Sequence, residues 1–250
     1  MDRYKNFEDK LKNREKIVGP VIQNISSTVI IEKMCDSVDF LLFDGEHGIF
    51  NSENLIEYLQ VARLKNTPAL VRVADTVYHL ISRVLYLGAD GIMIPRCETL
   101  EQVEVAVNSM NFPPKGKLGC GGHGQYRQNE DFFNFKRYLF LQIESPLGIE
   151  NLPEILKKYG EYISAVIIGP YDLSVMLNKP FDFENERFLQ SVQKIFDICK
   201  ENNISSGIFC DDEIKAKRYY EMGANVLWTS TDTNMFIRGF NETYNALKEL

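Results

Sequence analysis

The stretch Phe40-Leu41-Leu42-Phe43-Asp44-Gly45-Glu46-His47-Gly48 decides how the rest of this chain is interpreted. Its first four residues are all apolar, which is typical of a parallel strand that is covered on both faces. Two carboxylates, two glycines and a histidine follow, and an ordinary turn has no use for a histidine beside two acids. Chemistry in α/β folds is concentrated at the carboxyl ends of strands. The stretch therefore predicts a buried strand that ends in a functional site, with a solvated strand-to-helix turn as the alternative.

Similar units precede and follow this stretch along the chain. Each predicted strand is followed by a segment whose apolar residues have helical spacing. We expect eight strands, at 18–23, 40–43, 69–73, 91–94, 139–144, 165–168, 206–209 and 226–230. Expected helices include 4–16, 77–88, 99–110, 152–159, 185–201 and 212–222. Eight alternating units in 250 residues predict a single-domain (β/α)8 TIM barrel over residues 1–250, in preference to an open doubly wound sheet.

Composition excludes several classes of protein. A formal charge of −7 argues against an electrostatic grip on nucleic acid or on an anionic membrane surface, so an anionic substrate would need local cations or a metal ion. No apolar run approaches the ~18 residues that span a bilayer. The five cysteines lack Cys-x-x-Cys spacing, which argues against a disulfide framework or a zinc site and favours a cytoplasmic location. They are Cys35, Cys97, Cys120, Cys199 and Cys210.

Polar residues at the ends of the predicted strands should converge on one mouth of the barrel. They are Asp44, Glu46, His47, Arg72, Gln142, Glu144 and Asp172. Glu144 and Asp172 follow neighbouring strands, and their carboxylates would suit Mg²⁺ or Mn²⁺, with water or substrate filling the other positions. Two helix-capping acids are the alternative. Arg72 is expected either to pair with an acid of the barrel or to clamp a substrate carboxylate or enolate oxygen.

Other motifs carry less information. The glycine-rich segment 116–124 could bind an anion, but it lacks the spacing of a nucleotide-binding loop, and no dinucleotide-binding fingerprint follows a strand. His79 lies among apolar residues of a helix and is expected to be structural, whereas the role of His123 stays open. No lysine stands clearly at a strand end of the mouth, which disfavours a Schiff-base aldolase.

Five ordered segments resemble the metal-dependent class II aldolases of the HpcH/HpaI family, which cleave 4-hydroxy-2-oxo acids or 2-dehydro-3-deoxy sugar acids. The likeness covers nearly the whole chain. The segments are Asp44-Gly45-Glu46-His47, Val71-Arg72, Gln142-Ile143-Glu144, Gly169-Pro170-Tyr171-Asp172-Leu173-Ser174 and Thr231-Asp232-Thr233. The resemblance implies a (β/α)8 barrel and a homo-oligomer, a trimer or hexamer. It also implies a divalent ion, Mg²⁺ or Mn²⁺ with Co²⁺ as an alternative, chelated by pyruvate oxygens.

The resemblance also implies a role for each matching residue. His47 would be the base with Asp44 beside it, and Arg72 would hold the enolate. Glu144 and Asp172 would bind the metal ion. Five further residues of these motifs would line the substrate, namely Gln142, Tyr171, Glu46, Gly169 and Pro170.

Three departures from the family pattern bear on substrate choice. Leu118 stands where family members often carry an arginine. Cys120-Gly121-Gly122-His123 replaces a stretch that is usually rich in alanine. Tyr86 replaces an acid that would tune the basicity of the histidine. We therefore expect a conserved metal centre beside an altered aldehyde side.

The expected function is a divalent-metal-dependent aldolase that cleaves a 4-hydroxy-2-oxo acid to pyruvate and an aldehyde through a metal-bound enolate. Its partners would be these small molecules. Two alternatives stay open at this point. One is a related lyase or decarboxylase that acts on another oxo acid or an acyl thioester, and the other is a non-catalytic binding protein on the same barrel.

Overall fold

A closed barrel of eight parallel strands forms the centre of the computed structural model, which describes residues 2–121 and 136–250. The strands follow one another in sequence order, and β1 closes the barrel by pairing with β8. They are β1 (Ile17–Ile22), β2 (Leu41–Asp44), β3 (Ala69–Arg72), β4 (Gly91–Ile94), β5 (Tyr138–Ile143), β6 (Ile163–Ile168), β7 (Ser205–Cys210) and β8 (Val226–Thr231). The predicted barrel is confirmed, and every predicted strand boundary lies within two residues of the observed one.

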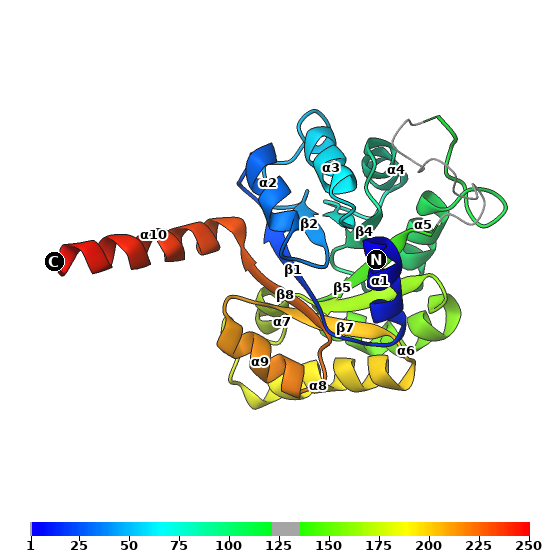
Figure 1. Ribbon diagram of the computed structural model, residues 1–250. Coiled ribbons are helices and arrows are strands. Elements are labelled where there is room, and N and C mark those ends of the chain that lie inside the picture. The colour runs from blue at the N-terminus through cyan, green and yellow to red at the C-terminus, as the bar shows by residue number, and fades with distance from the viewer. Residues whose placement is uncertain (1, 122–135) are drawn as a thin grey trace.

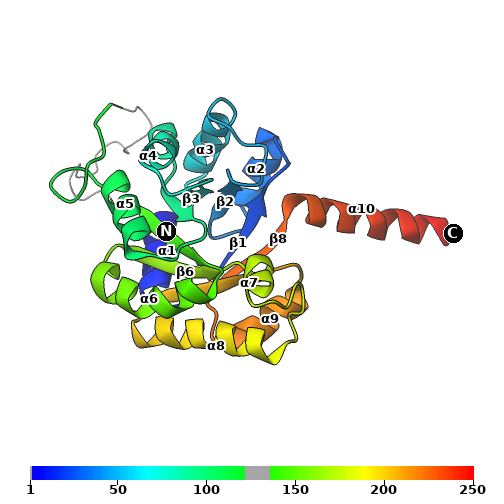
Figure 2. The same cartoon turned by 180° about the vertical axis from the view of Figure 1, so that it is seen from behind.

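Helices surround the barrel, except that one long helix projects from it (Figures 1 and 2). The surrounding helices are α2 (Thr28–Cys35), α3 (Leu55–Leu64), α4 (Tyr78–Leu87), α5 (Leu100–Met110), α6 (Pro146–Tyr159), α7 (Pro170–Met176), α8 (Glu186–Glu201) and α9 (Glu213–Glu221). α1 (Arg3–Lys12) closes the amino end of the barrel by placing Phe7 against Phe40 and Tyr138. α10 (Asp232–Lys248) is the projecting helix. None of the described helices is both long and apolar enough to span a bilayer.

Side chains alternate between the two faces of each strand, so the core has one part between strands and helices and another inside the barrel. On β2, Leu41 and Phe43 pack outward against the helices, whereas Leu42 packs inside the barrel together with Phe40, the residue just before the strand. Each of these four side chains is at most 1% exposed. Because side chains point to opposite faces in turn, the next inward position after Leu42 is Asp44, at the carboxyl end of the strand. The core pattern therefore aims this carboxylate into the mouth of the barrel.

Three helices differ from the prediction. α1 ends at Lys12, four residues before the expected end, because Arg14 adopts a left-handed backbone with φ of 53°. α6 begins at Pro146, six residues before the expected start, because the Ser145 hydroxyl accepts a hydrogen bond from the Gly148 amide and Pro146 occupies the first turn. Pro153, inside the helix, suggests a later start from sequence alone. α7 was not expected, since Gly169-Pro170 is also typical of a turn. By contrast, α5 begins where the sequence predicts it, and Thr99 and Gln102 form a capping box at that end.

Candidate active site at the carboxyl end of the barrel

Inward-facing rows of the strands end in polar side chains at the mouth of the barrel. On β3, Leu70 packs inside the barrel and Arg72 follows it two residues later. On β5, Phe140 is followed in the same way by Gln142 and then by Glu144. The polar group at the end of each row lies beyond the apolar interior, and these groups lie close together at the carboxyl end of the barrel. The sequence prediction placed these residues correctly at strand ends.

Asp44 and Arg72 form a buried, two-pronged ion pair. The Arg72 guanidinium donates from Nε to Oδ1 of Asp44 at 2.9 Å and from Nη2 to Oδ2 at 2.5 Å. Asp44 also accepts from the Gln23 amide at 2.7 Å and from the backbone N–H groups of Glu46 and His47 at 3.1 Å. Burial acts to raise the pKa of Asp44, but the hydrogen bond and charge of Arg72 outweigh it and lower that pKa. Asp44 thus stays charged and orients both Arg72 and the turn that bears His47.

Glu46 lies between three cationic or titratable groups. Its carboxylate oxygens are 3.5 Å from Nε of Arg72, 3.6 Å from Nη2 of Arg96 and 3.7 Å from Nε2 of His47. Burial raises the pKa of Glu46, although the nearby positive charges oppose that rise. The His47 side chain itself is 59% exposed, so its ring faces solvent and a ligand could reach it.

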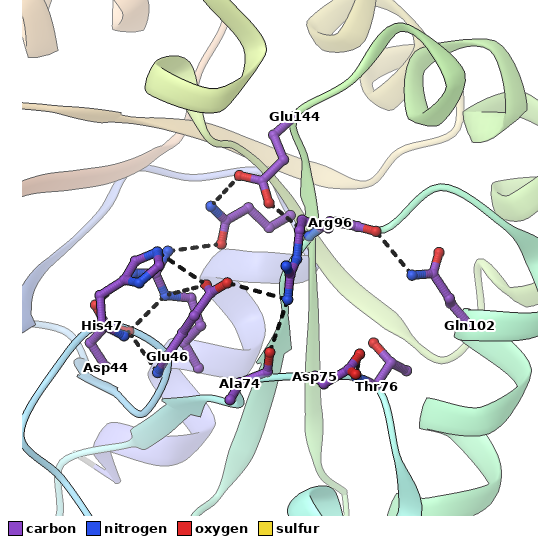
Figure 3. A network of polar contacts seen from close by, with 11 residues as sticks. Asp44, Glu46, His47, Ala74, Asp75, Thr76, Arg96, Gln102 and Glu144 are labelled. Carbon is purple, nitrogen blue, oxygen red and sulfur yellow. Dashed lines mark hydrogen bonds and ion pairs between the residues drawn. The ribbon is translucent and has the colours of Figure 1, made fainter. Parts of the chain in front are cut away.

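Glu144 sits in a shaped cradle (Figure 3). Its Oε1 accepts from the backbone N–H of Arg96 at 2.7 Å, and its Oε2 accepts from the Gln142 amide at 2.8 Å. A Cβ added at Gly169 would lie 2.2 Å from Oε2, so only glycine lets the end of β6 come this close. Arg96 adopts a left-handed backbone with φ of 48°, which turns its amide toward the carboxylate.

The Arg96 turn is held from both sides. Its guanidinium donates from Nη2 to the Ala74 carbonyl at 3.1 Å. Its own carbonyl accepts from the Gln102 side chain at 3.0 Å, and Gln102 in turn accepts from the backbone N–H groups of Glu98 and Thr99. Figure 3 follows this network from α5 to Glu144. The start of α5 therefore supports the Glu144 carboxylate through one intermediate residue.

The Glu144 and Asp172 carboxylates fit a divalent cation. Burial raises the pKa of Glu144 to about 7, and the charges of Asp172 and Glu46 act in the same direction. Asp172 lies exposed in the first turn of α7 and lines the cavity at the mouth of the barrel, which is described below. A cation between the two would relieve this repulsion and keep Glu144 ionised. Among the described residues no cluster of three or more such ligands exists, so water or substrate oxygens would complete the shell, as is usual for Mg²⁺.

One cavity of about 320 Å³ opens at this end of the barrel. Seven of the residues singled out from the sequence line it, namely His47, Arg72, Gln142, Gly169, Pro170, Tyr171 and Asp172. Asp44, Glu46 and Glu144 are not part of this lining, but each contacts a residue of it, Asp44 and Glu46 through Arg72 and Glu144 through Gln142. The rest of the wall consists of Val21, Gln23, Phe209, Asp211, Trp228, Thr231 and Asn234. Of these, only Thr231 belongs to a segment that was singled out from the sequence.

Tyr171 takes part in a second polar cluster on the cavity wall. Its hydroxyl donates to Oδ1 of Asp211 at 2.7 Å, and Lys215 Nζ donates to Oδ2 of Asp211 at 2.9 Å. The Tyr171 ring packs edge-on against Phe183 and lies beside Phe209. Asp211 lies two residues after Phe209, whose side chain packs against the inner core, and this spacing is the signal that could have identified it.

Asp232 connects α10 to the cavity wall. This carboxylate is 2% exposed, and its Oδ2 accepts from the backbone N–H groups of Gln23, Asn24 and Ile25 at 3.1, 2.8 and 2.6 Å. Of the residues of α10, all of which the structure describes, only Asp232 is buried. The first turn of the projecting helix therefore fixes the loop after β1.

The three departures from the family pattern have different surroundings. Leu118 is 2% exposed and packs into the outer core. The Tyr86 hydroxyl donates to the Gly119 carbonyl at 3.1 Å and lies 3.5 Å from that of Tyr78, so it holds the start of the glycine-rich segment. Burial raises the pKa of Tyr86 to about 12. Cys120 is exposed, and His123 lies outside the described residues.

Comparisons with known proteins agree on one family. The family model for the HpcH/HpaI aldolase/citrate lyase matches residues 24–239. The 5-keto-4-deoxy-D-glucarate aldolase of Escherichia fergusonii is 30% identical over 219 residues, which cover 84% of this chain and 84% of that protein. The 2-keto-3-deoxy-L-rhamnonate aldolase of Salmonella typhi is 26% identical over 255 residues, covering 98% of this chain and 93% of that protein.

A solved structure agrees with the fold. The HpcH/HpaI aldolase from Desulfitobacterium hafniense DCB-2 superposes with a TM-score of 0.88 at 24% sequence identity. The match covers 97% of this chain and 96% of that one. At this level of identity the likeness supports the (β/α)8 barrel, and the chemistry has to be argued from the site.

Proposed function

The chain belongs to the HpcH/HpaI aldolase/citrate lyase family and is an enzyme of the aldolase class, and from this premise we propose that it reversibly cleaves a 4-hydroxy-2-oxo acid to pyruvate and an aldehyde. The observation that carries the proposal is the convergence of His47, Arg72, Gln142 and Asp172 on one cavity, with Glu144 behind them. This set combines a base, a fixed positive charge and a pair of carboxylates.

Glu144 and Asp172 would hold a divalent ion, Mg²⁺ or Mn²⁺ in our proposal. When bound, such an ion supplies Lewis-acid stabilisation of negative charge on substrate oxygens. The Glu144 cradle supports this assignment, because its two donors fix the carboxylate while its raised pKa leaves it in need of a counter-charge. Gln142 and the Gly169-Pro170 turn would position the oxo acid beside these carboxylates.

The protein's own residues would carry the proton and the negative charge. His47 would take the proton from the C4 hydroxyl, after which the C3–C4 bond breaks and its electron pair passes into the enolate of pyruvate. Arg72 lies 6% exposed and is held by Asp44, so its charge is already oriented toward the developing oxyanion and little reorganisation is needed. In the direction of addition, His47 returns the proton to the new hydroxyl.

Exchange of the methyl protons of pyruvate into heavy water tests this proposal, with NMR as the readout. The half-reaction needs no aldehyde. We expect exchange with Mg²⁺ or Mn²⁺ that a chelator abolishes. Glu144→Gln should slow it by at least about 100-fold, since even the outer partners of a metal ligand are worth about 10–100-fold. Glu150→Gln, an exposed change on α6, is the matched control. A folded protein that binds the ion but catalyses no exchange would contradict the proposal.

We also propose that the protein is a homo-oligomer that assembles through α10. A stripe on this helix is at least 46% exposed, and it consists of Phe236, Ile237, Phe240, Tyr244 and Leu247. A groove of about 590 Å³ runs along the outer side of β8, where Leu227 and Thr229 are only half-buried. In a regular barrel the last helix covers this wall. The α10 helix of a second copy has the apolar face that such a groove requires.

A reducing, cytoplasmic location completes the proposal. All five cysteines are free, and four of them are buried, namely Cys35, Cys97, Cys199 and Cys210. Burial raises the pKa of Cys97, Cys199 and Cys210 to about 12, so these thiols are poor nucleophiles and poor candidates for disulfide exchange.

A further inference from the structure

We propose that the cavity wall formed after β7 and β8 is the subsite for the aldehyde, that it selects an uncharged, hydroxylated aldehyde, and that Asp211 is the residue that determines this specificity. The inference rests on the proposed function and names the second substrate class of the same site. None of the motifs identified from the sequence includes Asp211.

The placement of the subsite follows from strand order around the mouth. The proposed pyruvate-binding groups belong to β3, β5 and the start of α7, and they are Arg72, Gln142, Glu144 and Asp172. The cavity continues from there past Phe209 and Asp211 at the end of β7 to Trp228 and Thr231 on β8. His47, after β2, faces the same space. Once pyruvate occupies the first part, the remaining wall is the one that an aldehyde would meet.

Asp211 is held in place but keeps hydrogen-bonding capacity. Oδ1 accepts from Tyr171 and Oδ2 accepts from Lys215, which leaves each oxygen a second acceptor position. The Asp211 side chain is 32% exposed, so it remains accessible from the cavity that it lines. A hydroxyl group of a substrate can donate to this carboxylate, whereas a substrate carboxylate cannot.

The charges on this wall disfavour an anionic aldehyde. Within residues 2–121 and 136–250, Arg72 is the only lysine or arginine that lines the cavity, and it is paired with Asp44, while Lys215 beside the wall is paired with Asp211. A second carboxylate on the substrate would therefore face Asp211 without a free counter-charge, and like charges in a partly buried site repel strongly. Neighbouring Thr231 and Asn234 add hydroxyl and amide groups, which suit substrate hydroxyls.

Aromatic rings form the floor of the same subsite. Phe209 and Trp228 meet edge to face, with ring centroids 5.2 Å apart, and both line the cavity. Tyr171 lies beside Phe209 with a centroid distance of 6.1 Å. Such a floor packs against the C–H groups of a short carbon chain, while the rim groups bind its hydroxyls. The combination fits a small hydroxyaldehyde.

The test compares two aldehydes of equal length, glycolaldehyde and glyoxylate, as partners for pyruvate in the direction of addition. Glycolaldehyde carries a hydroxymethyl group next to its aldehyde carbon, whereas glyoxylate carries a carboxylate there. The readout is the ratio of kcat/KM for glyoxylate to that for glycolaldehyde. A smaller fraction of folded protein lowers both values equally and leaves this ratio unchanged. Asp211→Asn, which keeps the shape and removes the charge, should raise this ratio about tenfold. Lys215→Gln, which leaves Asp211 without its cation, should lower the ratio.

Asp212→Asn is the matched control, because it removes the same charge one residue away. Asp212 caps α9 by accepting from the Lys215 backbone N–H at 2.8 Å, and it lines the outer groove rather than the cavity. We expect it to leave the ratio as in the wild type. An unchanged or lowered ratio in Asp211→Asn, in a protein that still exchanges pyruvate protons, would overturn this inference alone. Absence of exchange in the wild type would overturn the proposed function and this inference with it.

Discussion

Asp44 accepts hydrogen bonds from Arg72, from Gln23 and from the turn that bears His47. It is fully buried, so its charge is stabilised almost entirely by these donors. A carboxylate in such a position orients its neighbours and leaves proton transfer to more exposed groups. In our proposal Asp44 therefore positions Arg72 and the His47 turn, while His47 itself moves the proton.

Replacing Asp44 by Asn should destabilise the protein by about 3–5 kcal/mol, because the buried Arg72 would lose its counter-charge. The folded-state pKa of Asp44 is lowered, so its contribution is present above the unfolded-state pKa of about 4 and is lost as the pH falls through the folded-state pKa. Urea unfolding from pH 6 to pH 3 measures both effects. The difference between wild type and Asp44→Asn should shrink below about pH 4.

Asp36→Asn is the control for that series, because Asp36 forms an exposed ion pair with Lys65. It should change the free energy of unfolding little at any pH. A difference between wild type and Asp44→Asn that stays constant down to pH 3 would show that the Asp44 charge is not what stabilises the fold.

Sequence reasoning identified the candidate site residues that end a run of apolar residues. Asp44, Arg72 and Gln142 each follow such a run, so their polarity stands out. Asp211 follows Phe209 in the same alternating way, but Cys210-Asp211-Asp212 also has the composition of a helix cap. Only the closed barrel shows that Asp211 faces the cavity while Asp212 caps α9.

The start of α5 acts beyond its own helix. Thr99 and Gln102 form a capping box, and Gln102 also donates to the carbonyl of Arg96, whose N–H binds Glu144. A cap that satisfies the first turn of a helix thereby fixes a turn with a left-handed residue beside the candidate metal centre.

Gln102→Glu separates these two roles. Glutamate keeps the acceptor of the capping box but loses the amide that donates to Arg96. We expect the midpoint of urea unfolding to change little and the Mn²⁺ concentration for half-maximal pyruvate exchange to rise about tenfold. Thr99→Ala should do the opposite, lowering stability by about 1 kcal/mol while leaving the Mn²⁺ requirement near that of the wild type. Equal effects of the two changes would contradict the coupling.

Strands were easier to predict than the helices near the site. A covered parallel strand is continuously apolar, which is a strong local signal, as in Leu139 to Leu141. The helices α6 and α7 begin with Ser145-Pro146 and Gly169-Pro170, and proline stands equally well in a turn or in a first helical turn. Packing in the barrel decides between these two outcomes, and packing cannot be deduced from a few residues.

Assembly is the main consequence at the scale of the whole molecule. α10 leaves the barrel, as Figures 1 and 2 show. The apolar side chains of its stripe are exposed to solvent. Its aromatic rings already stack, with Phe240 and Tyr244 centroids 4.4 Å apart. An isolated helix of this kind gains most of its stability from the partner on which it packs.

Phe240→Asp should therefore reduce the mass of the particle in solution, measured by size-exclusion chromatography with light scattering. The introduced charge would lie within the apolar contact and carry a desolvation penalty. Asn245→Asp adds the same charge on another side of α10 and should leave the mass unchanged. A wild-type protein that is monomeric at all concentrations would contradict assembly through this helix.

The Asp232 carboxylate, which begins α10 and holds the loop after β1, joins two equilibria that would otherwise be independent. If α10 docks on a second copy as proposed above, that docking and the ordering of the Gln23 side of the cavity share this anchor. By thermodynamic linkage, if assembly orders that loop and so strengthens ligand binding, then ligand binding must strengthen assembly by the same free energy. The factor by which substrate tightens subunit association would then equal the factor by which association tightens substrate binding.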